Sequence, residues 1–195
     1  PSVTVGGASP AARNTISGTG YVALYIYSAS GTVVQGNYIG TDAAGALDRF
    51  NGSHGVLAYN CVSPLIGGSG AGEGNLISAA SEGLYLQYGS GAIAQGNLMG
   101  TNASGTAAIP NSTGLLAQYT TSALVGGTAA GTGNLISGNP SFGVRVDGSG
   151  GTLIQGNRIG TQPDGLTALP NYFGIYLQEG ATFGGLAAGA GNIVP

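Results

Sequence analysis

The sequence predicts an all-β solenoid, a single-stranded parallel β-helix of about six coils, and three observations support this. One segment recurs at an interval of sixty residues, the apolar runs are short, and asparagine recurs at the turns. The three copies occupy residues 35–41, 95–101 and 155–161 and read QGNYIGT, QGNLMGT and QGNRIGT. A strict period of this length indicates a stack of similar units, each packed on its neighbours.

The apolar runs between the turns are predicted to be β-strands. They are short, alternate in polarity and are bounded by glycine or asparagine, as residues 83–87, 92–95 and 97–101 show. Such runs are too short and too interrupted for helices. Three short strands per coil, stacked on like neighbours, describe a parallel β-helix, whereas a leucine-rich repeat would need a segment with helical spacing.

Seven asparagines mark the turns, and their spacing describes the coils. They are Asn14, Asn37, Asn75, Asn97, Asn134, Asn157 and Asn192, separated by 23, 38, 22, 37, 23 and 35 residues. The sixty-residue period therefore holds two coils of alternating short and long length. Because asparagine tolerates left-handed backbone and its amide can bond to the asparagine above and below, we expect an Asn ladder with a structural role.

The recurring motifs QGN-x-IGT and IGG-x-x-x-G-x-GN-x-IS cover essentially the whole chain. They resemble those of right-handed parallel β-helix repeat proteins, the pectate-lyase-like fold group. This resemblance implies a right-handed coil, and residues 1–195 are expected to form one module. Because the sequence starts and stops inside a repeat, we expect the module to be excised from a larger protein with covalently attached neighbouring domains.

The composition argues against several classes of function. The four cationic residues are all arginines against seven carboxylates, and the net charge is −3, so a nucleic-acid-binding surface is not expected. No run approaches the length of a membrane span, and no membrane partner is expected. One histidine, one cysteine and scattered carboxylates give no metal-ligand spacing, so neither a metal nor another cofactor is expected.

Strand alternation divides the first run of each coil into inward and outward positions. The count starts at the residue that opens the run, namely Ala23, Gly55, Gly83, Gly114, Gly143 or Gly174. The first and third positions after it are apolar in every coil and are expected to face the core. The second, fourth and fifth positions then form three outward rows.

These three rows carry the side chains from which a function is predicted. The middle row reads Tyr25, Leu57, Tyr85, Leu116, Arg145 and Tyr176. The amide row reads Tyr27, Tyr59, Gln87, Gln118, Asp147 and Gln178. The turn row reads Ser28, Asn60, Tyr88, Tyr119, Gly148 and Glu179. Seven of the ten tyrosines fall in these rows, although the core needs none of them.

A ladder of phenols and amides, with coils about 4.8 Å apart, suits a polysaccharide. Sugar rings stack on aromatic rings, and sugar hydroxyls bond to amides. The alternative explanation is that tyrosine is favoured in strands and stacks on itself between coils to stabilise the sheet. The predicted carbohydrate-binding residues are Tyr25, Tyr27, Tyr59, Tyr85, Gln87, Tyr88, Gln118, Tyr119, Arg145, Asp147, Tyr176, Gln178 and Glu179.

We therefore expect a non-catalytic carbohydrate-binding module from a secreted or cell-surface bacterial protein. It resembles the β-helical carbohydrate-binding modules, one family of which binds xylan. A neutral, xylan-like plant cell-wall polysaccharide suits the scarcity of cations better than polygalacturonate does. The alternatives are a structural or adhesion β-helix segment of a surface protein, and a polysaccharide lyase or glycoside hydrolase.

An enzyme is not expected, and no catalytic residue is assigned. The lyases that the fold resembles use Asp-rich calcium sites, and the hydrolases use Asp pairs near a Gly-His-Gly segment. Here the nearest counterpart is Ser53-His54-Gly55, and His54 is expected to be a solvated turn residue. Asp147 and Glu179, with Arg145 beside them, form the best acidic group for cleaving a glycosidic bond. The same trio could instead form a surface ion pair or bond sugar hydroxyls.

Overall fold

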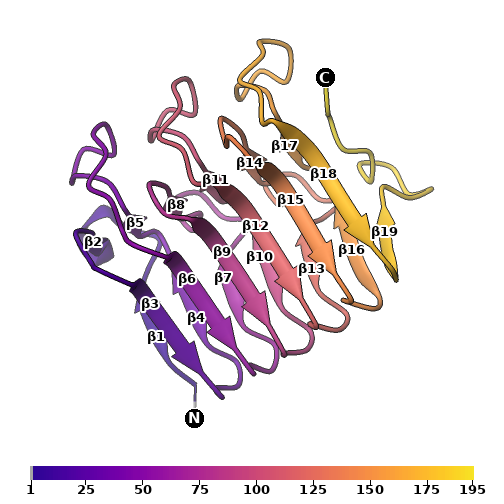
Figure 1. Cartoon of the computed structure of the whole chain (residues 1–195), viewed down its shortest axis with the longest axis horizontal. Helices are drawn as coiled ribbons and strands as arrows, with labels where there is room; N and C mark the ends of the chain where they lie inside the picture. The colour runs from indigo at the N-terminus through magenta and orange to yellow at the C-terminus, as the bar shows by residue number, and fades with distance from the viewer. Residues whose placement is uncertain (1) are drawn as a thin grey trace.

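The computed structural model describes residues 2–195 and shows three parallel sheets wound into a solenoid (Figure 1). Successive coils each add one strand to each sheet, and the two chain ends lie at opposite ends of the stack. Glycine-containing turns end each strand after a few residues and bend the chain. Three such strands, one in each sheet, complete one coil. The predicted all-β parallel β-helix is confirmed.

The longest strands form one sheet, which we call the long-strand sheet. In order along the stack, its strands are β3 (Val22–Tyr27), β6 (His54–Tyr59), β9 (Glu82–Gln87), β12 (Thr113–Gln118), β15 (Phe142–Asp147) and β18 (Phe173–Gln178). Its outward surface, the long-strand face, carries the residues predicted to bind.

Two sheets of shorter strands close each coil. The second sheet contains β1 (Thr4–Gly6), β4 (Val33–Gln35), β7 (Leu65–Gly67), β10 (Ile93–Gln95), β13 (Leu124–Gly126), β16 (Thr152–Gln155) and β19 (Ala181–Phe183). The third sheet contains β2 (Thr15–Ile16), β5 (Tyr38–Ile39), β8 (Leu76–Ile77), β11 (Leu98–Met99), β14 (Leu135–Ile136) and β17 (Arg158–Ile159). A short 3-10 turn, η1 (Pro10–Ala12), precedes β2.

The coils alternate in length because neighbouring coils carry their inserts in different turns. Residues that share a position in neighbouring coils are 32, 28, 31 and 29 residues apart over the first five coils. Loops 40–51, 100–111 and 160–171 follow the third-sheet strand in alternate coils and project on the same side of the solenoid in Figure 1. The intervening coils instead carry a glycine-rich turn before β8 and β14.

The inward positions of the long strands form a continuous apolar core, as predicted. Leu84, Leu86, Leu115 and Val144 are at most 1% exposed and pack against the inward residues of the other two sheets. Burying each large side chain contributes about 1.5–3 kcal/mol. Burial decreases at the last coil, where Leu177 is 39% exposed.

The Asn ladder joins all seven predicted asparagines. Each side-chain amide donates to Oδ1 of the next asparagine along the stack, from Asn14 to Asn37 at 2.9 Å through to Asn157 and Asn192 at 2.9 Å. Most of these amides also donate to a backbone carbonyl, as Asn97 does to Ile66 at 2.9 Å. Their polar groups are therefore satisfied inside the wall, which confirms the structural role.

One detail of the predicted turns is wrong. The left-handed backbone belongs to the glycine before the asparagine, since φ is +68° at Gly36, +65° at Gly96 and +66° at Gly156. A side chain at Gly96 would also meet the carbonyl oxygen of Gly68 at 2.2 Å. Glycine is required there for both reasons, and the asparagine stays free to align with the ladder.

A second, shorter ladder was not predicted. Asn139 donates to Asn171 Oδ1 at 2.8 Å, and its own Oδ1 accepts from the backbone N–H of Asn111 at 3.1 Å. Asn51, Asn111 and Asn171 are sixty residues apart, so the sequence contained a signal for it. This ladder holds the turns that lead into β12, β15 and β18.

Candidate functional site

The predicted outward rows exist, because strand pairing aligns them. Tyr25 pairs with Leu57, Leu57 with Tyr85, and Leu116 with Arg145, so the middle row is continuous across the coils. The amide row aligns in the same way through Gln87. The structure therefore brings the thirteen predicted residues onto the long-strand face or the turn that borders it.

The turn row has one backbone conformation throughout. Its φ values are +49°, +53°, +54°, +52°, +56° and +55° from the first coil to the last. The residues in that order are Ser28, Asn60, Tyr88, Tyr119, Gly148 and Glu179. This uniformity means that the row differs between coils in its side chains and not in its backbone.

A fourth outward row, the leading row, was missed. It reads Val22, His54, Glu82, Thr113, Phe142 and Phe173. Strict alternation would place these residues inside, but the pairing skips the glycine that follows each of them from the second coil on. A Cβ at Gly114 would lie 2.5 Å from the core atom Cγ2 of Ile136, so the glycine itself points inward. This local irregularity turns the preceding residue outward.

An open hollow of about 670 Å³ lies on the N-terminal half of the long-strand face. Four tyrosines line it, and His54 and Gln87 add polar groups. The tyrosines are Tyr21, Tyr25, Tyr59 and Tyr85. Tyr21 and Tyr25 are more than half exposed, so this hollow offers open aromatic surface beside hydrogen-bonding side chains.

His54 is not a solvated turn residue, which corrects the expectation from the sequence. It lies in β6, is 9% exposed, and its Nδ1 is 2.9 Å from Oε2 of Glu82 on the next coil. Its ring contacts those of Tyr21 and Tyr85, with centroids 5.7 and 5.3 Å away. Glu82 therefore holds the imidazole in place against the aromatic lining of the hollow.

Tyr85 is the most strongly perturbed phenol. Burial, and secondarily the negative charge of Glu82, raises its pKa from 10.0 to about 12. Its hydroxyl donates to Oε1 of Gln118, which also accepts from Nε2 of Gln87 at 3.1 Å. The neutral phenol and the two amides therefore form one network across the two neighbouring strands β9 and β12.

The tyrosines form a line of ring contacts across the coils. Tyr27 stacks on Tyr59 with planes 12° apart, Tyr59 meets Tyr88 edge to face, and Tyr88 stacks on Tyr119 with planes 13° apart. Centroid separations along this line are between 5.3 and 5.7 Å. The alternative role for these residues, stacking between coils, is therefore present in the structure. The line ends at Tyr119, because the next residue in the turn row is Gly148.

A second aromatic cluster lies at the C-terminal end of the same face. Phe142 stacks on Phe173 with centroids 5.1 Å apart and meets Tyr176 edge to face at 5.6 Å. The guanidinium of Arg145 lies over Phe142 and Tyr176 at 5.4 and 5.6 Å. The cation is thus held by aromatic rings on one side.

The acidic group proposed from the sequence is not two free carboxylates. Asp147 is 6% exposed and forms an ion pair with Arg145, with Nη2 and Oδ2 2.9 Å apart. Glu179 is exposed and falls in the turn row beside Gly148, whereas Asp147 pairs with Gln178. Arg145 and Asp147 are therefore brought together, and Glu179 stands apart from their ion pair.

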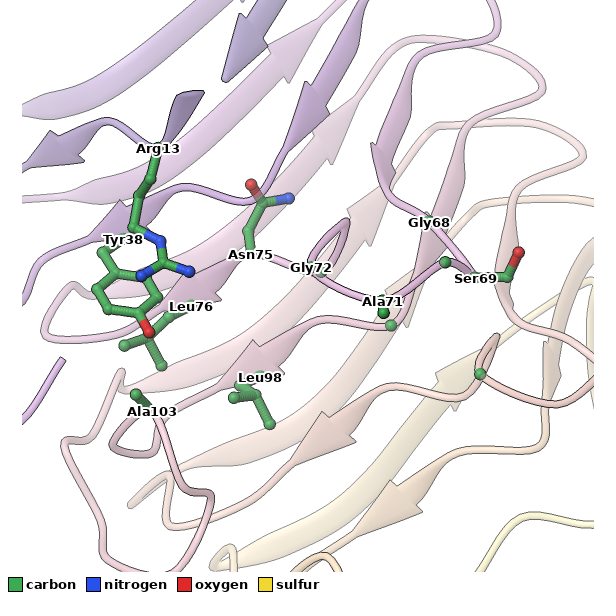
Figure 2. A pocket seen from close by; sticks show the side chains of 14 residues that line it. Arg13, Tyr38, Gly68, Ser69, Ala71, Gly72, Asn75, Leu76, Leu98 and Ala103 are labelled. Carbon is green, nitrogen blue, oxygen red and sulfur yellow. The ribbon is translucent and has the colours of Figure 1, made fainter. Parts of the chain in front are cut away.

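A different hollow, of about 580 Å³, lies over the third sheet (Figure 2). Figure 2 shows the Arg13 guanidinium over the Tyr38 ring, 4.0 Å from its centroid, beside Leu76, Leu98 and the glycine-rich turn. Nε of Arg13 donates to the carbonyl of Gly36 at 3.1 Å. None of the predicted binding residues lines this hollow.

Within residues 2–195, no group of three His, Cys, Asp or Glu side chains is arranged to hold a metal ion. The same part of the chain has no helix that is long and apolar enough to cross a membrane.

No protein-family model matches the chain, and no curated protein or solved structure matches it either. The architecture itself is a parallel β-solenoid whose wall is held by an Asn ladder.

Proposed function

We propose that this protein is a non-catalytic carbohydrate-binding module that recognises a neutral, xylan-like polysaccharide on its long-strand face. The observation that carries the proposal is the hollow of about 670 Å³ lined by four tyrosines, His54 and Gln87. Aromatic rings with polar tips beside fixed amides suit sugar rings and their hydroxyls. A secreted or cell-surface protein with attached neighbouring domains remains part of this proposal.

The charges of the face also favour a neutral ligand. Arg145 is the one arginine in the four outward rows, and its charge is paired with Asp147. Glu82 and Glu179 add negative charge to the same face. A polyanion such as polygalacturonate would meet repulsion there, whereas hydroxyl groups can donate to these carboxylates.

A structural or adhesion segment is the second candidate, and the interlocked tyrosines favour it. Rings that stack on one another across coils stabilise the wall by about 0.5–1.5 kcal/mol per pair. Each inner ring of this line, Tyr59 and Tyr88, contacts a ring on both sides. The catalytic alternative has less support, because the carboxylate of Asp147 is buried against Arg145.

Native affinity electrophoresis separates the two main candidates. The intact chain is run in gels containing soluble xylan, mixed-linkage β-glucan or polygalacturonate. We expect xylan to retard the wild type, and Tyr25→Ala to reduce the retardation because it removes one wall of the hollow. Tyr172→Ala, at an exposed tyrosine outside the hollow, is the matched control and should leave it unchanged. Migration unaffected by every glycan would contradict binding and support the structural role.

A further inference from the structure

Arg13 carries a side chain where the repeat elsewhere has glycine. It precedes Asn14 of the Asn ladder, and the residue before each of the six later ladder asparagines is a glycine. At Gly74, one of these glycines, a Cβ would collide with the carbonyl oxygen of Gly96 on the next coil. In the first coil, Arg13 instead donates from Nε to the corresponding carbonyl, that of Gly36, at 3.1 Å. The solenoid therefore does not need an arginine at this turn, because the other coils form it with glycine.

The guanidinium of Arg13 is held in place but keeps two free nitrogens. It lies over the ring of Tyr38, 4.0 Å from the centroid, while Nε is bound to the Gly36 carbonyl. Within residues 2–195 neither Nη atom donates to a protein group, and no carboxylate lies within 4.0 Å of this arginine. A guanidinium that is already fixed loses less freedom on binding, and its two Nη groups match the two oxygens of a carboxylate.

The hollow of about 580 Å³ beside Arg13 is positively charged. Of the fourteen residues that line it, Arg13 is the only one with a charge. Glu73 belongs to the adjoining glycine-rich turn but does not line the hollow, and its Oε2 accepts from the N–H of Gly70 at 2.8 Å. No carboxylate of the lining therefore competes for the guanidinium, and the volume is in the range of small-molecule pockets.

Apolar side chains also line the hollow. Leu98 lies in β11 and Ala103 in the loop that follows this strand, and both are partly exposed. Figure 2 shows them near Leu76, with Arg13 at one side of the group. A ligand whose charged group meets the guanidinium would bring its other atoms against these side chains, where burial of apolar atoms is favourable. The lining therefore suits an anion that has an apolar body.

We infer that the hollow at Arg13 is a second binding site, which takes a small organic carboxylate with an apolar body. The carboxylate accepts hydrogen bonds from the two Nη groups of Arg13, and the body packs on Leu98 and Ala103. Tyr38 holds the guanidinium from the face of its ring. The site does not depend on the proposed glycan function, because no residue predicted to bind the glycan lines this hollow.

Benzoate is the probe, since it joins one carboxylate to one apolar ring. Benzamide has nearly the same shape without the charge, and acetate has the charge without the ring. Each compound is titrated into the labelled wild-type chain at pH 7 and constant ionic strength, and the backbone amide shifts are followed by NMR. We expect benzoate to bind with a Kd on the order of 1–10 mM and to shift residues 68–74, Leu98 and Ala103. Benzamide and acetate should each bind about tenfold more weakly or worse.

A charge-removing variant tests the role of the arginine. Arg13→Gln should weaken benzoate binding about tenfold or more. Arg49→Gln removes the same charge from the exposed loop 40–51, outside the hollow, and should bind benzoate like the wild type. Circular dichroism verifies that both variants are folded. The comparison of the three probes uses only the wild type, so it decides the matter even if Arg13→Gln does not fold.

Four results would overturn the site at Arg13. They are benzamide binding as tightly as benzoate, benzoate shifts centred elsewhere on the chain, no shifts with benzoate, and undiminished binding by Arg13→Gln. Acetate binding as tightly as benzoate would overturn the apolar body as a part of the ligand.

Discussion

Tyr88 and Tyr119 belong to successive coils, yet their rings lie 5.3 Å apart with planes 13° apart. This stack shows that one tyrosine can serve the wall and the surface together. The shared ring faces stabilise neighbouring coils, while Tyr119 leans over Gly148 of the following coil and is still 53% exposed. A stabilising role for the tyrosines therefore does not compete with ligand binding on the same face.

The Asn ladder predicts a large loss of stability from a single substitution. Asn97 is 1% exposed, donates to Asn134 and Ile66, and accepts from Asn75. Asn97→Ala leaves several of these buried groups unpaired and should lower the free energy of unfolding by about 2–4 kcal/mol. Denaturation by guanidinium chloride, followed by circular dichroism, measures the change.

The matched control for the ladder is Gln178→Ala, which removes an exposed amide from the long-strand face. It should change the free energy of unfolding by no more than about 0.5 kcal/mol. Equal effects of the two substitutions would contradict a stabilising ladder.

The glycine at the second position of the long strands from β6 onward predicts a second effect on stability. At Gly114 a Cβ would lie 2.5 Å from Cγ2 of Ile136 and 2.8 Å from the carbonyl oxygen of Gly143. Gly114→Ala should therefore lower the free energy of unfolding by about 1–3 kcal/mol through overpacking. Gly150→Ala, in open space, is the control and should have little effect. Similar midpoints for the two alanine variants would show that the irregularity at the glycine is not needed.

The contact between His54 and Glu82 predicts that the carboxylate stabilises the fold. Glu82→Ala removes the hydrogen-bond partner of a largely buried imidazole and should cost about 1–3 kcal/mol. Glu82→Gln keeps an acceptor at this place and should cost less. Glu179→Ala, at an exposed carboxylate, provides the control in the same denaturation experiment. A loss no greater than that of Glu179→Ala would mean that the contact contributes nothing.

Tyr85 predicts a decrease in stability at alkaline pH. Burial raises its pKa from 10.0 in the unfolded chain to about 12 in the folded chain. Between these values the folded state binds more protons than the unfolded state, so stability falls as pH rises from about 10 to 12. Below pH 10 the phenol is neutral in both states, and this contribution to the pH dependence disappears.

Comparison with Tyr85→Phe isolates that contribution from the other tyrosines. The variant lacks the hydrogen bond to Gln118 but has no phenol to ionise at this position. The free energy of unfolding of the wild type should therefore fall more steeply with pH above 10 than that of the variant. Parallel pH profiles would show that Tyr85 ionises as it does in the unfolded chain.

The fold was predictable because its determinants are local and periodic. Spacing alone identified each of the seven ladder asparagines, and alternation identified the core residues and three outward rows. The leading row was not predictable in this way, because the irregularity at Gly55 and its equivalents depends on the core atoms opposite. The pairing of Arg145 with Asp147 and the ring orientation of Tyr119 are likewise consequences of packing between coils.

The location of a bound glycan is the most direct test of binding on the long-strand face. Chemical-shift mapping of the labelled protein with xylohexaose can report every backbone amide at once. We expect shifts concentrated in strands β3, β6 and β9, which line the hollow of four tyrosines. Shifts centred instead on the hollow at Arg13 and Tyr38, or no shifts with xylohexaose or any other neutral oligosaccharide, would contradict binding on the long-strand face.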